Sequence, residues 1–153
     1  MRDFEKARNY KKFEQLKLKK MNNKTNLIYK NLHLLISLSI VVPTAFIYGS
    51  PSILPKFLDI QVNTIDISNM LKAVMCLYFG ISFIWILGIW KSEYWKNATL
   101  LNILFMLSLG SGRALSMLID GKPTDGYIFG ILAELIIGIF SIYQFKKYNK
   151  IEK

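Results

Sequence analysis

The sequence predicts an all-α integral membrane protein, a four-helix bundle with both termini in the cytoplasm. Three observations lead to this prediction: four apolar blocks of membrane-spanning length, basic residues concentrated at the two ends of the chain, and aromatic residues at the block boundaries. Of the 153 residues, 52% are hydrophobic. They are gathered into blocks and not spread at amphipathic spacing, a pattern typical of contact with lipid.

The apolar blocks form a predicted transmembrane domain over residues 31–146, with spans at about 32–49, 70–90, 99–119 and 127–145. A helix rises about 1.5 Å per residue and needs about 20 apolar residues to cross about 30 Å of hydrocarbon. Each block is close to that length. No small-residue cleavage site follows the first block, so we expect it to stay in the membrane as a span and not to be removed as a signal peptide.

Two basic tails flank this domain, residues 1–30 and 147–153. The net charge of +10 would suit a nucleic-acid-binding protein. The apolar blocks between the tails could not face water, however, so we expect no nucleic-acid partner. Apolar residues in the first tail are too irregularly spaced to predict an amphipathic helix, and we expect a tail in solvent or on the membrane surface. Met21 is an alternative start that would leave a short polar lead.

The positive-inside rule gives the orientation. Fourteen of the twenty Lys and Arg residues lie in 1–30 or from Lys146 onward, and the 91–98 link adds two more. These regions are predicted to be cytoplasmic. The 50–69 and 120–126 links carry more acidic than basic residues and are predicted to lie outside an inner (plasma) membrane.

Both outer links have further features. The 50–69 link is too apolar for a free loop, and we expect it to cap the outer face of the bundle. In the second link Gly121 suits a helix C-terminus, and Thr124 or Asp125 can cap the next helix. The third and fourth spans should therefore form a tight antiparallel hairpin.

Arg113 and Glu134 are the ionisable residues deepest in these two spans. Counting about 1.5 Å per residue, Arg113 lies about 10 Å inward from Asp120, and Glu134 about 13 Å inward from Asp125. Charged groups inside a span are costly and usually face the bundle interior. The matching depths predict a charge-assisted hydrogen bond between the two side chains.

Helical spacing places other polar residues in line with this pair. We expect a polar pocket, open toward the outside, that binds a small molecule and is lined by Lys72, Arg113, Ser116, Asp120 and Glu134. Small residues at Gly130, Gly138, Ser108 and Gly112 would let another helix approach.

Several functions remain open for this pocket. Arg113 and Glu134 can be a structural staple in a membrane interaction protein, or they can bind an anionic or amphipathic molecule such as a lipid head group. A membrane enzyme, for example an isomerase of a lipid-soluble substrate, would use Glu134 as acid or base. Proton coupling through Glu134 is a further alternative, and transport would require a homo-oligomer to enclose a path.

Other chemistry has little support in the sequence. His33 is the single histidine, and there is no nucleophile with a paired base, no phosphate-binding glycine loop and no Cys-x-x-Cys motif. We therefore expect no metal, no cofactor and no assigned catalytic residue. The membrane bilayer is the expected environment, with a small molecule or a lipid as ligand.

Four segments in order carry a family resemblance: Asn69–Tyr78, Leu109–Ser116, Asp120–Pro123 and Glu134–Gly138. Through them the chain resembles, from about Leu34 to Phe145, a bacterial four-span membrane family, domain of unknown function 4345. In that family the cation of the second span is commonly arginine, where this chain has Lys72. The resemblance implies a four-span fold and carries no established activity.

Overall fold

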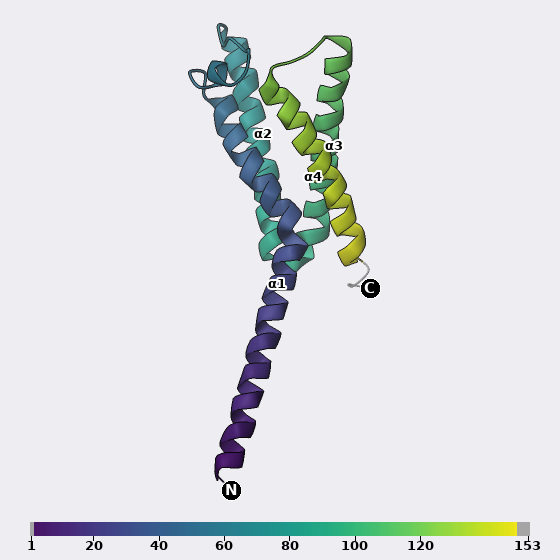
Figure 1. Ribbon diagram of the computed structural model, residues 1–153. Helices are drawn as coiled ribbons and strands as arrows, with labels where there is room; N and C mark the ends of the chain where they lie inside the picture. Colours follow the sequence, from purple (N-terminus) through teal and green to yellow (C-terminus); the bar gives the residue numbers. More distant parts are fainter. Residues whose placement is uncertain (1, 150–153) are drawn as a thin grey trace. The chain divides into compact units, whose positions relative to one another are not determined.

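The computed structural model describes the backbone of residues 2–149 and the side chains of residues 26–149. The chain divides into two units, residues 1–32 and 33–153, and each is described by itself. The described backbone is helical and contains no strand. Its elements, labelled in Figure 1 where there is room, are α1 (Arg2–Gly49), η1 (Leu54–Lys56), α2 (Ile65–Trp90), η2 (Ser92–Tyr94), α3 (Trp95–Ile119) and α4 (Asp125–Asn149).

The first unit belongs to the N-terminal part of α1, which runs without a break from Arg2. The sequence predicts no amphipathic helix over residues 1–30, and the helical backbone found from Arg2 onward does not contradict that prediction. The intrinsic helix propensity of the residues, and not an apolar periodicity, accounts for this helix. Lys and Leu are common in this stretch, neither glycine nor proline occurs before Pro43, and such a composition favours helix even without an apolar stripe.

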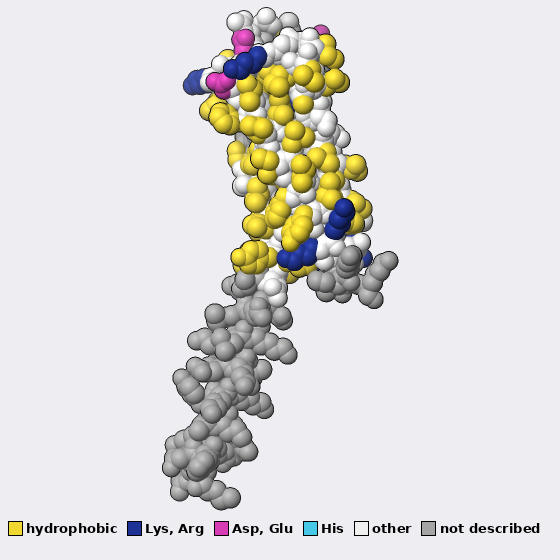
Figure 2. All heavy atoms as spheres, turned by 45° about the vertical axis from the view of Figure 1, so that its right-hand side comes forward, with side chains coloured by type: hydrophobic (Ala, Val, Ile, Leu, Met, Phe, Trp, Pro, Cys, Tyr) yellow, Lys and Arg dark blue, Asp and Glu magenta, His cyan; other side chains and the backbone are white. Residues whose placement is uncertain are grey.

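Four helices are long and apolar enough to cross a membrane, which confirms the predicted fold class. They are Asn26–Gly49, Ile65–Trp90, Ser92–Ile119 and Asp125–Asn149. On the face shown in Figure 2, hydrophobic side chains cover the body of the molecule and charged side chains gather toward its ends. Large apolar residues such as Phe46, Leu104 and Ile136 are exposed on this body, as expected where lipid is the solvent. The chain is a multi-pass membrane protein.

The helices extend beyond the predicted spans because their ends include polar residues. Helix α2 begins at Ile65, five residues before the predicted start, and Thr64 caps it by accepting a hydrogen bond from the Ile67 amide at 3.2 Å. Asp66 in the first turn is favourable at the positive end of the helix dipole. Hydropathy detects the apolar part of such a helix and misses its capped polar turn.

The helix bundle of the second unit has two ends, which we call the Pro51 end and the Trp95 end. The Pro51 end holds residues 50–64 and 120–124, and the Trp95 end holds residues 91–94 and the last turn of α4. In Figure 1, residues 33–49 of α1 lie beside α2, and α3 lies beside α4. Aromatic edge contacts join neighbouring helices, for example Tyr48 with Tyr78 and Trp85 with Phe105.

At the Trp95 end a buried polar network connects three helices. The His33 ring lies 3.0 Å from the Thr99 hydroxyl, and the Asn102 amide donates to Ser37 at 2.6 Å. The Ser141 hydroxyl of α4 donates to the side-chain oxygen Oδ1 of Asn102 at 3.1 Å. All five side chains are fully buried. Paired polar groups are stabilising in a membrane interior, so this network fixes α1, α3 and α4 against one another.

At the Pro51 end the 50–64 link packs on the bundle, as the sequence predicts. Leu54 of η1 is fully buried, and Leu58 and Ile60 pack against the core. Gly121 follows α3 with a φ of +106°, a left-handed conformation that suits glycine at the end of a helix. The resulting short turn lets α4 return antiparallel to α3.

The α3–α4 contact depends on Gly138, whereas Gly112 faces outward. A Cβ atom at Gly138 would meet Leu107 Cδ2 at 2.5 Å, but one at Gly112 would meet nothing within 4 Å. Gly138→Ala should therefore unfold at a lower temperature than the wild type in detergent, with an overpacking cost of about 1–3 kcal/mol. Gly112→Ala is the matched control and should be neutral or stabilising by up to about 1 kcal/mol. Equal melting temperatures for the two variants would contradict the close approach at Gly138.

Candidate functional site

The predicted ion pair joins α3 and α4 near the Pro51 end. Arg113 Nη1 donates to Glu134 Oε1 at 2.5 Å. Glu134 is 8% exposed, and the Arg113 side chain is 20% exposed. The depth count from the sequence thus gives the correct pairing. A charge-assisted hydrogen bond of this kind in a membrane interior is strong, because each group alone would be unsolvated.

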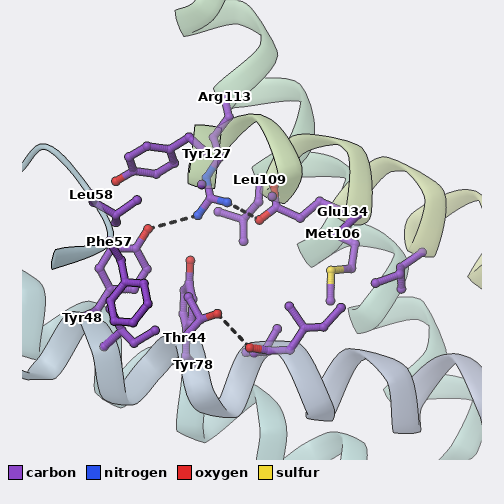
Figure 3. Close-up of a pocket in the computed structure, with 17 residues that line it drawn as sticks. Thr44, Tyr48, Phe57, Leu58, Tyr78, Met106, Leu109, Arg113, Tyr127 and Glu134 are labelled. Atoms are coloured by element: carbon purple, nitrogen blue, oxygen red, sulfur yellow. Dashed lines mark hydrogen bonds and ion pairs between the residues drawn. The ribbon is translucent and has the colours of Figure 1, made fainter. Parts of the chain in front are cut away.

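Arg113 has two more partners, both tyrosines. Its Nη2 atom donates to the Tyr48 hydroxyl at 3.2 Å, and its guanidinium carbon lies 5.3 Å from the centre of the Tyr127 ring. Figure 3 shows the Arg113 side chain between Tyr48 and Glu134, with Tyr127 beside it. Arg113 therefore connects α1 and both helices of the α3–α4 hairpin.

A cavity of about 230 Å³ lies next to this cluster. Among the described residues that line it, Arg113 and Glu134 are the charged ones, and most of the others are apolar (Figure 3). Tyrosine hydroxyls from Tyr48, Tyr78 and Tyr127 add polar atoms. The lining residues are Ile40, Val41, Thr44, Ile47, Tyr48, Phe57, Leu58, Tyr78, Met106, Leu109, Arg113, Gly126, Tyr127, Gly130, Ala133, Glu134 and Ile137.

A second, more open cavity of about 550 Å³ adjoins the first. Arg113 and its neighbouring tyrosines line both cavities, so this cluster forms the wall between them. The second cavity is also lined by residues of α2 and of the Pro51 end, among them Ile60, Met70, Leu71, Val74 and Pro123.

The second carboxylate oxygen of Glu134 lacks a partner. Oε1 accepts from Arg113, but Oε2 is buried and has no hydrogen-bond partner among the described residues. A buried acceptor without a partner costs free energy, about 1–3 kcal/mol or more when it is charged. Because this oxygen is buried, a ligand in the cavity would reach it only if the Glu134 side chain moved.

The structure brings together only part of the predicted pocket. Ser116 lines the larger cavity, where its hydroxyl donates to Asp120 at 2.8 Å. Asp120 itself is exposed and lines neither cavity. Lys72 is also exposed and lines neither cavity, because α2 turns the side of the helix that carries Lys72 and Cys76 outward. The sequence alone does not determine how α2 is rotated about its own axis.

The three tyrosines were missing from the predicted pocket. Tyr48 and Tyr127 lie at span ends, where aromatic residues commonly mark the membrane interface. Because that role already accounts for their positions, the sequence gives no reason to expect their contact with Arg113. Tyr78 lies in the middle of α2 and is 5% exposed. A tyrosine at the depth of a buried charge is the signal that could have indicated it, because its hydroxyl needs a polar partner.

The family described as domain of unknown function (DUF4345) matches residues 30–144. The chain belongs to this family. The DUF4345 match covers every residue that lines the two cavities. Comparison with curated proteins gives no match, and comparison with solved structures gives none. Function must therefore be argued from the site.

Metal chemistry has no evident place in the described part of this DUF4345 protein. Among residues 26–149, no group of three or more His, Cys, Asp or Glu side chains is positioned to hold a metal ion. The site instead offers one ion pair, tyrosine hydroxyls and an apolar hollow. This set can bind and orient a small molecule.

The ion pair should show strong coupling in a double-mutant cycle. Arg113→Met leaves the Glu134 carboxylate without its cation, and Glu134→Gln leaves the cation without its anion, so each should cost about 3 kcal/mol. The double variant should cost less than the sum of the two. Thermal unfolding of the four proteins in detergent measures this coupling.

The exposed Lys122–Asp125 pair, 3.7 Å apart, provides a matched control. Lys122→Met should cost less than about 1 kcal/mol because water already solvates both groups. Additive losses at Arg113 and Glu134 would show that the pair contributes no coupling to stability.

Proposed function

We propose that this membrane protein binds a small anionic or amphipathic molecule in the cavity beside Arg113 and Glu134. The observation that carries the proposal is a cavity of about 230 Å³ with a mostly apolar lining, in which Arg113 and Glu134 are the charged residues among those described. Ligand sites in proteins are typically concave and mostly apolar, with a few polar groups that fix orientation. The lining of this cavity has that composition.

The size of the cavity also supports binding. An apolar cavity of about 150 Å³ is enough to bind benzene. The 230 Å³ beside Arg113 can hold a somewhat larger group. The cavity of about 550 Å³ on the other side of Arg113 is more open and offers further room at the same polar cluster.

Catalysis by Glu134 has less support than binding. A general acid or base needs a carboxyl oxygen that the substrate can reach, but Oε1 lies 2.5 Å from Arg113 Nη1 and Oε2 is buried. The isomerase alternative would need Glu134 to be apart from Arg113. The observed contact therefore ranks binding first.

The proposed orientation places the Pro51 end outside and both termini in the cytoplasm of a bacterial inner membrane. Lys91 and Lys96 lie at the Trp95 end, as do Lys146 and Lys147 in the last turns of α4. Basic residues concentrate on the cytoplasmic side of such membranes. The cavity would then open toward the outside.

Reporter fusions test this orientation. Fusions after Trp95 and at the C-terminus should report cytoplasmic locations, and fusions near Asp59 or Lys122 should report external ones. The physical reason is that the basic segments resist translocation. An external signal from the C-terminal fusion would overturn the proposed orientation.

Co-purification tests ligand binding. Ala133 lines the cavity, so Ala133→Phe should fill it, whereas Leu132 is exposed on the same helix and Leu132→Phe is the matched control. Mass spectrometry of the proteins purified from membranes should find a small molecule or lipid enriched in the wild type and in Leu132→Phe. The species should be lost from Ala133→Phe. Equal amounts in all three would contradict binding in this cavity.

A further inference from the structure

We infer that the ligand carries a head group with an acceptor oxygen, a carboxylate or a carbonyl, which accepts hydrogen bonds from Arg113 and the tyrosine hydroxyls beside it. This inference rests on the proposed function and narrows it. It specifies the hydrogen-bonding chemistry of the head group. It also assigns the recognition of that head to donors that the 230 Å³ cavity shares with the larger cavity.

The guanidinium of Arg113 has unused hydrogens. Of its five N–H hydrogens, Arg113 donates one to Glu134 and one to Tyr48, so one remains on Nε and one on each terminal nitrogen. Nε has no hydrogen bond within the described structure, and it is not one of the atoms that are both buried and without a partner. The Nε–H is therefore open to a small molecule.

These hydrogens belong to a polar wall that both cavities share. The wall consists of Arg113, Tyr48, Tyr78 and Tyr127, which line the 230 Å³ cavity and the 550 Å³ cavity alike, and we call it the donor wall. In Figure 3 the guanidinium lies among the three tyrosines. A tyrosine hydroxyl can donate as well as accept, so a head group at this wall meets hydrogens from several side chains.

The acceptors of the ion pair are less available than these donors. Glu134 Oε1 already accepts from Arg113 at 2.5 Å, and Oε2 is buried. The charged group that a ligand reaches is then the guanidinium. A hydrogen bond from a charged donor is stronger than one between neutral groups, and a low-dielectric interior strengthens it further. An acceptor oxygen on the ligand gains this bond.

The rest of the 230 Å³ cavity suits an apolar body. Val41, Met106 and Ile137 present apolar side chains there, from α1, α3 and α4. A second polar group, placed away from the donor wall, would lose its water without gaining a partner and would weaken binding. The ligand is therefore a compact amphiphile with one acceptor head. A neutral carbonyl compound and a carboxylate share this chemistry, and the choice of probes distinguishes them.

Four probes with one para-ethylphenyl body test the inference on the full chain in lipid nanodiscs. They are para-diethylbenzene (apolar), para-ethylacetophenone (neutral acceptor), para-ethylbenzoate (anionic acceptor) and para-ethylbenzylamine (cationic donor). Equilibrium dialysis against empty nanodiscs of the same lipid corrects for partitioning into the bilayer. The better acceptor probe should bind at least about tenfold more tightly than the apolar and cationic probes, because only an acceptor bonds to Arg113. Which acceptor binds better shows whether the preferred head is neutral or charged.

Two changes remove donors from the wall. Arg113→Met/Glu134→Leu removes both charges and leaves neither unpaired, so the preference for an acceptor should be lost. Tyr78→Phe removes one hydroxyl and keeps both charges, so it remains informative if the double variant does not fold. It should reduce the preference by about threefold or more. Tyr143→Phe is the matched control, because Tyr143 is exposed and lines neither cavity.

A further pair of variants locates the binding. Ala133→Phe should abolish the binding of the better acceptor probe, and Leu132→Phe should retain it. If Ala133→Phe binds as the wild type does, or if no probe binds beyond the empty nanodiscs, the proposed function fails and the inference fails with it.

Other outcomes overturn the inference alone. Equal binding of para-diethylbenzene and both acceptor probes would show that the donor wall recognises no head group, and tightest binding of para-ethylbenzylamine would show a donor head. An acceptor preference that stays unchanged in every donor-wall variant that folds would place the recognition elsewhere. In each of these cases binding in the cavity stands.

Discussion

The ion pair between Arg113 and Glu134 constrains the arrangement of the second unit. In hydrocarbon neither charge has water to solvate it, so each must face the other, and this requirement fixes the rotation of α3 against α4. The second nitrogen of Arg113 extends the constraint to α1 through Tyr48. A single side chain therefore sets the relative positions of three helices near the Pro51 end.

A second set of polar contacts does the same at the Trp95 end. Ser37, Asn102 and Ser141 again join α1, α3 and α4, but through neutral groups. Between the two sets the contacts are apolar, with Met106 and Ile137 nearly or fully buried. Apolar contacts in lipid have little specificity, so the two polar sets determine the register of the helices. The cavity lies beside the charged set.

The depth of a residue along its helix could be predicted from the sequence. The side of the helix that faces its neighbours could be predicted only in part. Each residue advances a helix by a fixed rise, so the meeting of Arg113 and Glu134 followed from their distances to the turn at Gly121. The side that a helix turns to its neighbours depends on the packing of all of them. Lys72 and Gly112 were therefore expected inside and lie outside, whereas Gly138 packs at the helix contact as expected. The sequence did not indicate Tyr48 as a partner of Arg113, because it lies at a span end, where tyrosines commonly mark the membrane interface.

The geometry of the pair differs from that of a structural pair with two parallel hydrogen bonds. A structural arginine–carboxylate pair commonly forms two parallel hydrogen bonds, which use both carboxylate oxygens and both terminal nitrogens. Arg113 instead divides its two nitrogens between Glu134 and Tyr48, and Glu134 keeps one oxygen free within the described structure. The free oxygen lowers the contribution of the pair to stability, because a buried acceptor without a partner is costly. The second terminal nitrogen of Arg113 bonds to Tyr48 instead, so the pair gives up one hydrogen bond between α3 and α4 for a contact with a third helix.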